Sequence, residues 1–374
     1  MALPGTEHQP HARAVLTPAL PPGGTASHAY LFHGPAGSGK RDVARQLATA
    51  LLADGAPDPA NAALRVEHGT HPDLTWVTPS GAADLVKEDI EEPVVGAAAH
   101  TPFEAKRRVF VIERVDRFND TAANRMLKTL EEPPSFVHIL LLTDHLEQVM
   151  PTIASRCQLV RFDQPPVADQ AARLERHGIA PDQAVACARL SLGDGEKALA
   201  LALNPALRAA AEQFARESLR DQLTGRPWLA LLEPASAAGT RAFDECGALL
   251  KEELEVTAKR DVKRTEREGT ERAKRAERRA RTETLDLGLA LVGLWFRDLA
   301  CLADGAPEVI HHTDRRAQLN EDTRAADPGR LRPAITLVDD TRQRLQLNVA
   351  EELACEVLAY RLAALLRATA RAAA

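Results

Sequence analysis

A chain of 374 residues is long enough for two or three domains, each with its own hydrophobic core. Hydrophobic residues make up 45% and aromatic residues only 4%, which favours a helix-rich globular protein over a β-sandwich. The formal net charge of -6 excludes a generally basic nucleic-acid-binding protein, so any such contact must be local.

Cysteine usage and hydropathy predict the compartment. The 5 cysteines are dispersed and form no CxxC pair, so the sequence predicts neither a zinc site nor a disulfide framework. The chain shows no leader peptide and no apolar run of about 18 residues. We therefore expect a soluble cytoplasmic protein with reduced thiols and no membrane partner.

Residues 1–165 alternate between short apolar segments and helical patterns. Residues 1–27 have a weak core signal, and residues 53–71 are expected to be a polar connector. Helices are expected over residues 41–52 and 119–130. Strands are expected over residues 30–33, 74–77, 109–112, 136–143 and 159–162. This alternation predicts an α/β domain with a parallel sheet flanked by helices.

Strand signals fade after Pro165 and Pro166. Residues 166–205 show short helical patterns, which predict a small helical domain. Residues 206–374 predict a separate all-helical domain. Its last helix carries apolar residues at helical spacing, and we expect core packing there, with an oligomer interface as the alternative. These residues are Val349, Leu353, Val357, Leu362 and Leu365.

The segment 251–283 is highly charged. It contains 12 Lys or Arg residues and 9 Asp or Glu residues, a net charge of only +3. Because it has almost no apolar stripe, it predicts a solvated helix pair or a long projecting helix. Contact with DNA or with a protein partner is the alternative.

A glycine-rich loop follows the first strand and precedes a helix, the arrangement that cradles a triphosphate. The candidate nucleotide-binding residues are Gly34, Gly37, Ser38, Gly39, Lys40 and Arg41. Lys40 would reach the outer phosphates. The next residue normally supplies a hydroxyl ligand to magnesium, but Arg41 has a positive charge and no acceptor. The loop therefore predicts weak binding of ATP or ADP and puts magnesium coordination in doubt; a structural turn without phosphate is the alternative.

The strand 109–112 is followed by Glu113 and Arg114. At these two positions a Walker B motif has a metal-holding aspartate and a water-activating glutamate. The longer side chain of Glu113 would need a different placement to face a metal. Arg114 cannot activate water as a carboxylate does. Together with Arg41, this degenerate pair argues against efficient ATP hydrolysis.

Arg156 lies in the loop between the last two strands. Its guanidinium is permanently charged and can bind phosphate oxygens by donating two hydrogen bonds. At a subunit boundary such a group stabilises the charge of a transferring phosphoryl group. An arginine in a loop is, however, commonly a surface ion-pair residue, and this remains the alternative.

Five segments together resemble bacterial clamp-loader AAA+ subunits, most closely the delta-prime type of DNA polymerase III. These segments are HPD (71–73), VFVI (109–112), DRFN (116–119), AANRMLKTLEEPP (122–134) and PTIASRCQ (151–158). The resemblance is close from about residue 28 to 163. Beyond residue 205 only the length and helical character match.

This resemblance implies an AAA+ domain, a small helical lid at 166–205 and a helical collar at 206–374. It implies that Arg156 is an arginine finger for a neighbouring subunit and that Thr143 is the sensor 1 residue. It also implies tau/gamma-like motor subunits and the delta clamp opener as partners, with the sliding clamp and primer-template DNA reached through the complex. Relatives often carry a four-cysteine zinc module, but residues 53–71 contain no cysteine, so no zinc is expected.

Three functions compete on these residues. The first is a non-motor clamp-loader subunit that donates Arg156 and neither polymerises DNA nor hydrolyses ATP efficiently. The second is an active ATPase similar to the tau/gamma motor, with Glu113 replacing the usual aspartate; Arg41 and Arg114 count against it. A kinase-like P-loop enzyme is the third, but it explains neither the loop at 151–158 nor the helical end.

Overall fold

The fold was obtained as a computed structural model, which describes residues 3–21, 23–79, 85, 87–256, 262–345 and 349–367. The chain forms two compact units. One unit comprises Met1–Pro166 together with Gly193–Gly195, and the other comprises Val167–Leu192 and Glu196–Ala374. The separate boundary expected at residue 205 remains a prediction.

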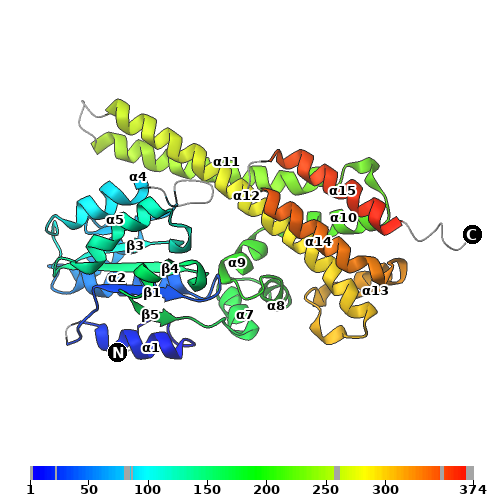
Figure 1. The fold of residues 1–374 in the computed structure, drawn as a ribbon. Coiled ribbons are helices and arrows are strands. Elements are labelled where there is room, and N and C mark those ends of the chain that lie inside the picture. The colour runs from blue at the N-terminus through cyan, green and yellow to red at the C-terminus, as the bar shows by residue number, and fades with distance from the viewer. Residues whose placement is uncertain are drawn as a thin grey trace, which may run out of the picture. The chain divides into compact units, whose positions relative to one another are not determined.

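A five-stranded parallel sheet lies at the centre of the N-terminal unit (Figure 1). Its strand order is β2-β3-β4-β1-β5. The strands are β1 (Ala29–His33), β2 (Leu74–Val77), β3 (Arg108–Ile112), β4 (Val137–Thr143) and β5 (Gln158–Arg161). Every residue of β3 and β4 is buried, as expected for strands covered on both faces. All five predicted strands are confirmed to within one residue at each end.

Helices cover both faces of this sheet. On one face, α1 (Pro10–Leu16) and α2 (Lys40–Ala53) share a core with alternate residues of β1, β3 and β4. On the other face, α5 (Asp120–Glu131) packs on the intervening strand residues. Short helical elements complete the unit: η1 (Thr17–Ala19), α3 (Pro59–Glu67), α4 (Lys87–Ile90), η2 (Glu91–Gly96), η3 (Val115–Arg117), η4 (Leu146–Gln148) and α6 (Pro151–Ala154). The predicted α/β fold class is confirmed.

Two expectations for this unit were wrong. The region 1–27, expected to contribute little, buries Leu3, Ala12 and Leu16 completely or nearly so. The supposed connector 53–71 contains α3, whose Asn61 backbone N–H is capped by the Asp58 carboxylate. Asp58 followed by a proline at the first helical position is a helix-start signal that hydropathy alone did not reveal.

The C-terminal unit is entirely helical in its described residues. Its core is one cluster centred on residues such as Trp295 and Phe214. The helices are α7 (Val167–Arg176), α8 (Pro181–Leu190), α9 (Gly195–Leu203), α10 (Pro205–Leu219), α11 (Trp228–Val256), α12 (Val262–Ala303), α13 (Arg316–Ala325), α14 (Pro328–Leu345) and α15 (Glu351–Arg367). Single turns form η5 (Leu223–Gly225), η6 (Pro307–Val309) and η7 (Thr313–Arg315). No helix in the described part of the chain is both long and apolar enough to cross a membrane.

The apolar stripe predicted on the last helix is only partly core. Leu362 is fully buried and Leu365 packs against the core. Val349, Leu353 and Val357 are instead exposed, Leu353 by 56%. The apolar residues therefore span more of the helix circumference than the core can cover.

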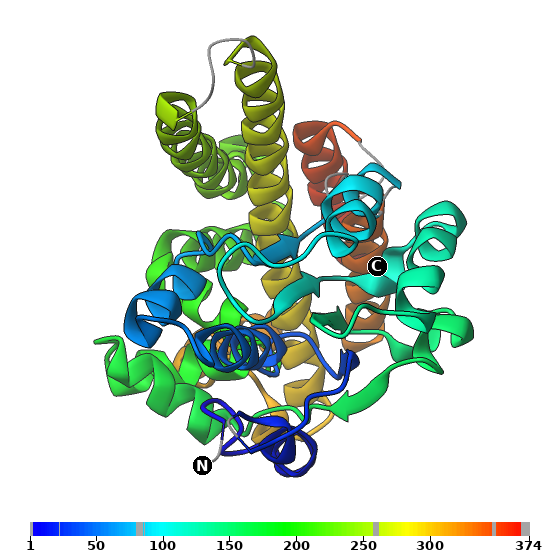
Figure 2. The same ribbon diagram turned by 90° about the vertical axis from the view of Figure 1, so that its left-hand side faces the viewer.

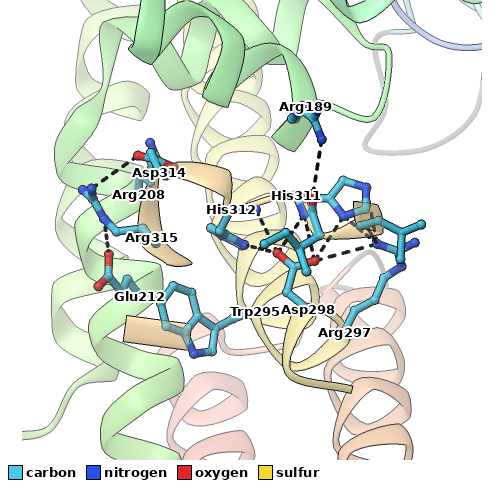
Figure 3. A network of polar contacts seen from close by, with 12 residues as sticks. Arg189, Arg208, Glu212, Trp295, Arg297, Asp298, His311, His312, Asp314 and Arg315 are labelled. Atoms are coloured by element: carbon cyan, nitrogen blue, oxygen red, sulfur yellow. Dashed lines mark hydrogen bonds and ion pairs between the residues drawn. The ribbon is translucent and has the colours of Figure 1, made fainter. Parts of the chain in front are cut away.

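A buried carboxylate organises the turn that follows α12. Asp298 is fully buried and accepts hydrogen bonds from the backbone N–H groups of His311 and His312 at 2.8–3.0 Å. Its oxygens also contact the Nδ1 atoms of both imidazoles, at 3.2 and 2.8 Å (Figure 3). Burial raises the pKa of Asp298, but these hydrogen bonds outweigh burial and hold the pKa well below its usual value.

The helices α11 and α12 run side by side as a long hairpin (Figures 1 and 2). Small residues form part of their contact, because a Cβ at Gly269 would lie 2.2 Å from a methyl carbon of Leu250. A Cβ at Gly239 would lie 3.1 Å from the Glu277 carbonyl oxygen. The predicted charged segment 251–283 supplies the end of α11 and the first half of α12, and its residues 257–261 lie outside the described residues.

Candidate nucleotide site and arginine loop

The glycine-rich loop joins the carboxyl end of β1 to the start of α2. Gly34 has φ +145°, and a Cβ there would lie 2.2 Å from the Phe162 carbonyl oxygen. Gly37 has φ +69°, and a Cβ there would lie 2.3 Å from the Cα of Asp194. Both positions therefore require glycine for space as well as for backbone conformation.

Lys40 is turned back onto its own loop. Its Nζ donates hydrogen bonds to the carbonyl oxygens of Gly34 at 2.8 Å and Pro35 at 2.7 Å, and to Ser38 Oγ at 3.3 Å. It also forms an ion pair of 2.7 Å with Asp144, which follows β4. The side chain is only 6% exposed, so the ammonium that would meet a phosphate is buried among acceptors of the same chain.

Gln9 ties the N-terminal segment to the loop. Its side-chain amide donates to the carbonyl oxygens of Ser38 at 3.1 Å and Asp163 at 2.8 Å. Its carbonyl oxygen accepts the Asp163 backbone N–H at 2.7 Å. This buried residue fixes the loop between α1 and the end of β5.

Arg41 and Glu113 contact each other directly. Arg41 Nε lies 2.8 Å from Glu113 Oε1, and Trp76 Nε1 donates to the same oxygen at 2.5 Å. Arg41 and Glu113, which both depart from the residues usual in P-loop ATPases, therefore form one ion pair between the start of α2 and the end of β3. A guanidinium occupies the side of the loop where a hydroxyl would ligate magnesium, and the carboxylate already holds two N–H donors.

The metal-binding chemistry expected of a complete P-loop site does not fit these residues. Magnesium requires oxygen ligands in near-octahedral geometry, and a cationic side chain at position 41 opposes it. Among the described residues, no group of three or more His, Cys, Asp or Glu side chains could hold a metal ion. No metal-dependent step is therefore assigned to this pocket.

Thr143 and Arg114 differ in their relation to the pocket. Thr143 ends β4, beside the loop, and its Oγ1 donates to Asp116 Oδ1 at 2.6 Å and accepts the His145 N–H at 3.0 Å. Arg114 is exposed and adopts a left-handed backbone with φ 55°. The structure thus brings Thr143 to the sheet edge that carries the loop but leaves Arg114 on the surface.

Arg156 lies in a separate loop, directly after α6. Its Nη1 donates to the Thr152 carbonyl oxygen at 2.7 Å, and its Nη2 forms an ion pair with the Glu131 carboxylate. The side chain is 34% exposed, so a partner can reach it. Burial raises the pKa of the adjacent Cys157 to about 12, which keeps that thiol protonated and unreactive.

Sequence reasoning missed the internal partners of the site. Asp144, Trp76, Gln9 and Glu131 were not singled out, although each contacts a predicted residue. Asp144 had a usable signal, because it directly follows a strand whose carboxyl end meets the loop. The partner of Arg156 had none, since Glu131 ends a helix 25 positions earlier in the chain.

Comparison with known proteins finds relatives of the N-terminal unit. Residues 9–166 match the family model described as DNA polymerase III, delta subunit. A DNA polymerase III subunit delta' from Bacillus subtilis is 35% identical over 140 residues, which is 36% of this chain and 42% of that protein. A subunit of the same name from Pseudomonas aeruginosa is 38% identical over 136 residues, covering 35% of this chain and 42% of that protein.

The DNA polymerase III subunit tau of Bacillus subtilis is also similar, at 34% identity over 147 residues, 39% of this chain and 26% of that protein. The predicted resemblance to delta-prime subunits is confirmed for the N-terminal unit. The chain matches about two-fifths of the length of the two delta-prime relatives.

Proposed function

We propose, from the delta-prime-like sequence of residues 9–166, that this chain is a non-motor subunit of a DNA polymerase III clamp loader. Its partners would be tau/gamma-like motor subunits and a delta subunit in the cytoplasm. It would reach the sliding clamp and primer-template DNA through that complex. The chain itself would neither polymerise DNA nor hydrolyse ATP efficiently.

The observation that carries this proposal is the Arg41–Glu113 ion pair. Hydrolysis in P-loop ATPases needs a bound metal and an oriented water. Here the residue after the loop lysine is a cation, and its charge is matched by the carboxylate that would otherwise be available to a metal. This pairing counts against an active ATPase similar to the tau/gamma motor. That ATPase is the second candidate function, because the chain is also similar to subunit tau.

Nucleotide binding by this chain would be weak. The glycine loop and the amino end of α2 still favour an anion. However, a phosphate must displace Lys40 from two carbonyl oxygens and from Asp144 before it gains that cation. We therefore expect weak binding of ATP or ADP with little magnesium dependence.

Arg156 would act on the nucleotide of a neighbouring subunit. It lies in the loop 151–158 rather than at its own glycine loop, and it is accessible. A guanidinium held near a neighbour's triphosphate would stabilise negative charge that develops on the transferring phosphoryl group. In this role the chain contributes to ATP hydrolysis without binding the reacting nucleotide.

The test is Arg156→Ala in the reconstituted loader. We expect normal assembly and at least a tenfold loss of DNA-stimulated ATPase and clamp loading. This loss is smaller than the roughly 10³–10⁵ that a single arginine finger provides, because the complex holds several ATP sites. Arg156→Lys should rescue poorly because lysine lacks the planar fork. The matched control is Arg125→Ala, which removes another exposed, ion-paired arginine of the same unit. Wild-type ATPase in the Arg156→Ala complex would refute the finger role.

A second assay separates the ATPase alternative. The purified chain should hydrolyse ATP no faster than its Lys40→Ala variant. Turnover that depends on Lys40 would instead make the chain a motor.

A further inference from the structure

Four cations of α12 form a stripe along one side of the helical hairpin. Lys263, Arg267, Lys274 and Arg278 are all exposed. Their spacing of 4, 7 and 4 residues places them on one face of an α-helix. At 1.5 Å rise per residue the stripe is about 22 Å long.

The packing of the hairpin turns this stripe away from α11. The opposite face of α12 carries Gly269 against Leu250, and Ala273, which is only 2% exposed. At the base of the hairpin, Arg281 forms an ion pair with Glu351 at 2.5 Å, and Thr282 contacts the same carboxylate at 3.2 Å. The hairpin is therefore anchored at one end and presents its cations to solvent along its length.

The first half of this helix differs in charge from the whole chain. Residues 262–281 contain 9 Lys or Arg and 4 Glu, a net charge of +5, whereas the whole chain has a net charge of -6. Arg267 and Arg278 form no ion pair with any residue that the structure describes. Lys274 pairs with Glu271 at 3.2 Å, but both side chains are more than half exposed, and such a pair contributes little.

We propose that this stripe binds the phosphate backbone of double-stranded DNA. An extended row of exposed cations, of which Lys274 alone has a weak surface ion pair among the described residues, matches a row of phosphates. A protein partner would instead be expected to use apolar or aromatic anchors. None of the exposed large apolar side chains of the described residues lies on α12.

The experiment is a salt titration of duplex binding by the full chain. A fluorescein-labelled duplex of random sequence, about 30 base pairs long, reports binding by anisotropy at several KCl concentrations. We expect the variant Lys263→Gln, Arg267→Gln, Lys274→Gln, Arg278→Gln to bind at least tenfold more weakly at low salt. The slope of log K against log salt should flatten by about 3 to 4, since each phosphate contact contributes about 0.9.

A charge-matched control excludes a general electrostatic effect. Four other exposed arginines of the same unit, Arg324, Arg332, Arg344 and Arg361, are changed to Gln in one variant. This control should keep the wild-type slope to within about 1. Circular dichroism should show that both variants keep the wild-type helix content.

Two outcomes would overturn the proposal. One is a stripe variant with wild-type affinity and slope; the other is a wild-type chain that binds no duplex at low salt. If the stripe variant lost binding to an acidic protein but kept wild-type affinity for the duplex, the stripe would be assigned to a protein partner instead. None of these results bears on Arg156, so the clamp-loader role and the stripe can fail separately.

Discussion

The glycine loop and the α12 stripe are both rich in cations but hold them in opposite ways. At the loop, Lys40 and Arg41 are each matched by a carboxylate of the same unit, at 2.7 and 2.8 Å. On the stripe, Arg267 and Arg278 have no ion-pair partner among the described residues and are exposed. A cation already satisfied within the chain offers little to a ligand, whereas an exposed one loses little when it binds.

This difference reverses the impression that the sequence gives. The loop has the motif of a phosphate site, yet its charges are internally neutralised. The charged segment has no motif, yet its Arg267 and Arg278 are exposed and have no ion-pair partner among the described residues. Which charges are paired depends on residues far apart in the chain. Substitutions that remove a paired group therefore test the comparison, through the change in stability or in ligand affinity that they cause.

The largest expected effect is at Asp298, a fully buried and paired charge. Asp298→Ala leaves the N–H groups of His311 and His312 without their acceptor in a buried site. We expect the free energy of unfolding of the C-terminal unit to fall by about 3–5 kcal/mol, measured by urea denaturation.

The control for Asp298 is Asp304→Ala, which removes a carboxylate that is 60% exposed and pairs with Arg332. It should change stability by less than about 0.5 kcal/mol. Equal losses in both variants would show that burial and pairing do not govern the stability contributed by these charges.

A smaller effect, on ATP affinity, is expected from removing the ion pair beside the glycine loop. The double change Arg41→Thr, Glu113→Asp removes the ion pair and restores a hydroxyl and a shorter carboxylate. We expect ATP affinity to rise at least tenfold, about 1.4 kcal/mol, and to become magnesium-dependent, as measured by calorimetry. Adding Lys40→Ala should abolish the gain. Unchanged affinity would mean that the loop is closed by contacts other than the Arg41–Glu113 pair.

The smallest effect concerns pH. Burial lowers the pKa of His138, partly offset by its contact with the Ser27 carbonyl oxygen. A lowered folded-state pKa contributes stability that is present above the unfolded value of about 6.5 and is lost as pH falls through the folded value. Hydrogen exchange of β4 amides should therefore speed up, relative to its intrinsic rate, from pH 7 to 5. His138→Gln should weaken this dependence, and an identical pH profile would assign it to other groups.

The sheet was predictable because its signal is local. Runs such as 109–112 and 136–143 are apolar without interruption, and strands buried on both faces have that pattern whatever their neighbours. The glycine loop was equally readable, since Gly34 and Gly37 are required by a conformation that few other residues adopt.

The partners within the site were not predictable, because they depend on strand order. Asp144 meets Lys40 only because β4 lies next to β1 in the sheet. Trp76 meets Glu113 only because β2 pairs with β3 in a register that aligns Val77 with Ile112. One sequence fixes the residue types but not these adjacencies. The N-terminal segment was missed for a related reason: its few apolar residues become core only once α2 is in place.

The Glu131 contact makes any action of Arg156 on a neighbour an exchange of one anion for another. The guanidinium must leave a carboxylate, and a phosphoryl oxygen must replace it. The benefit to the neighbouring site is then the difference between two ion pairs rather than the full strength of one. Glu131 would thereby favour release of the Arg156 guanidinium to a highly charged triphosphate over its release to a less charged product. The carboxylate at the end of α5 would then make the action of Arg156 depend on the charge of the neighbour's nucleotide.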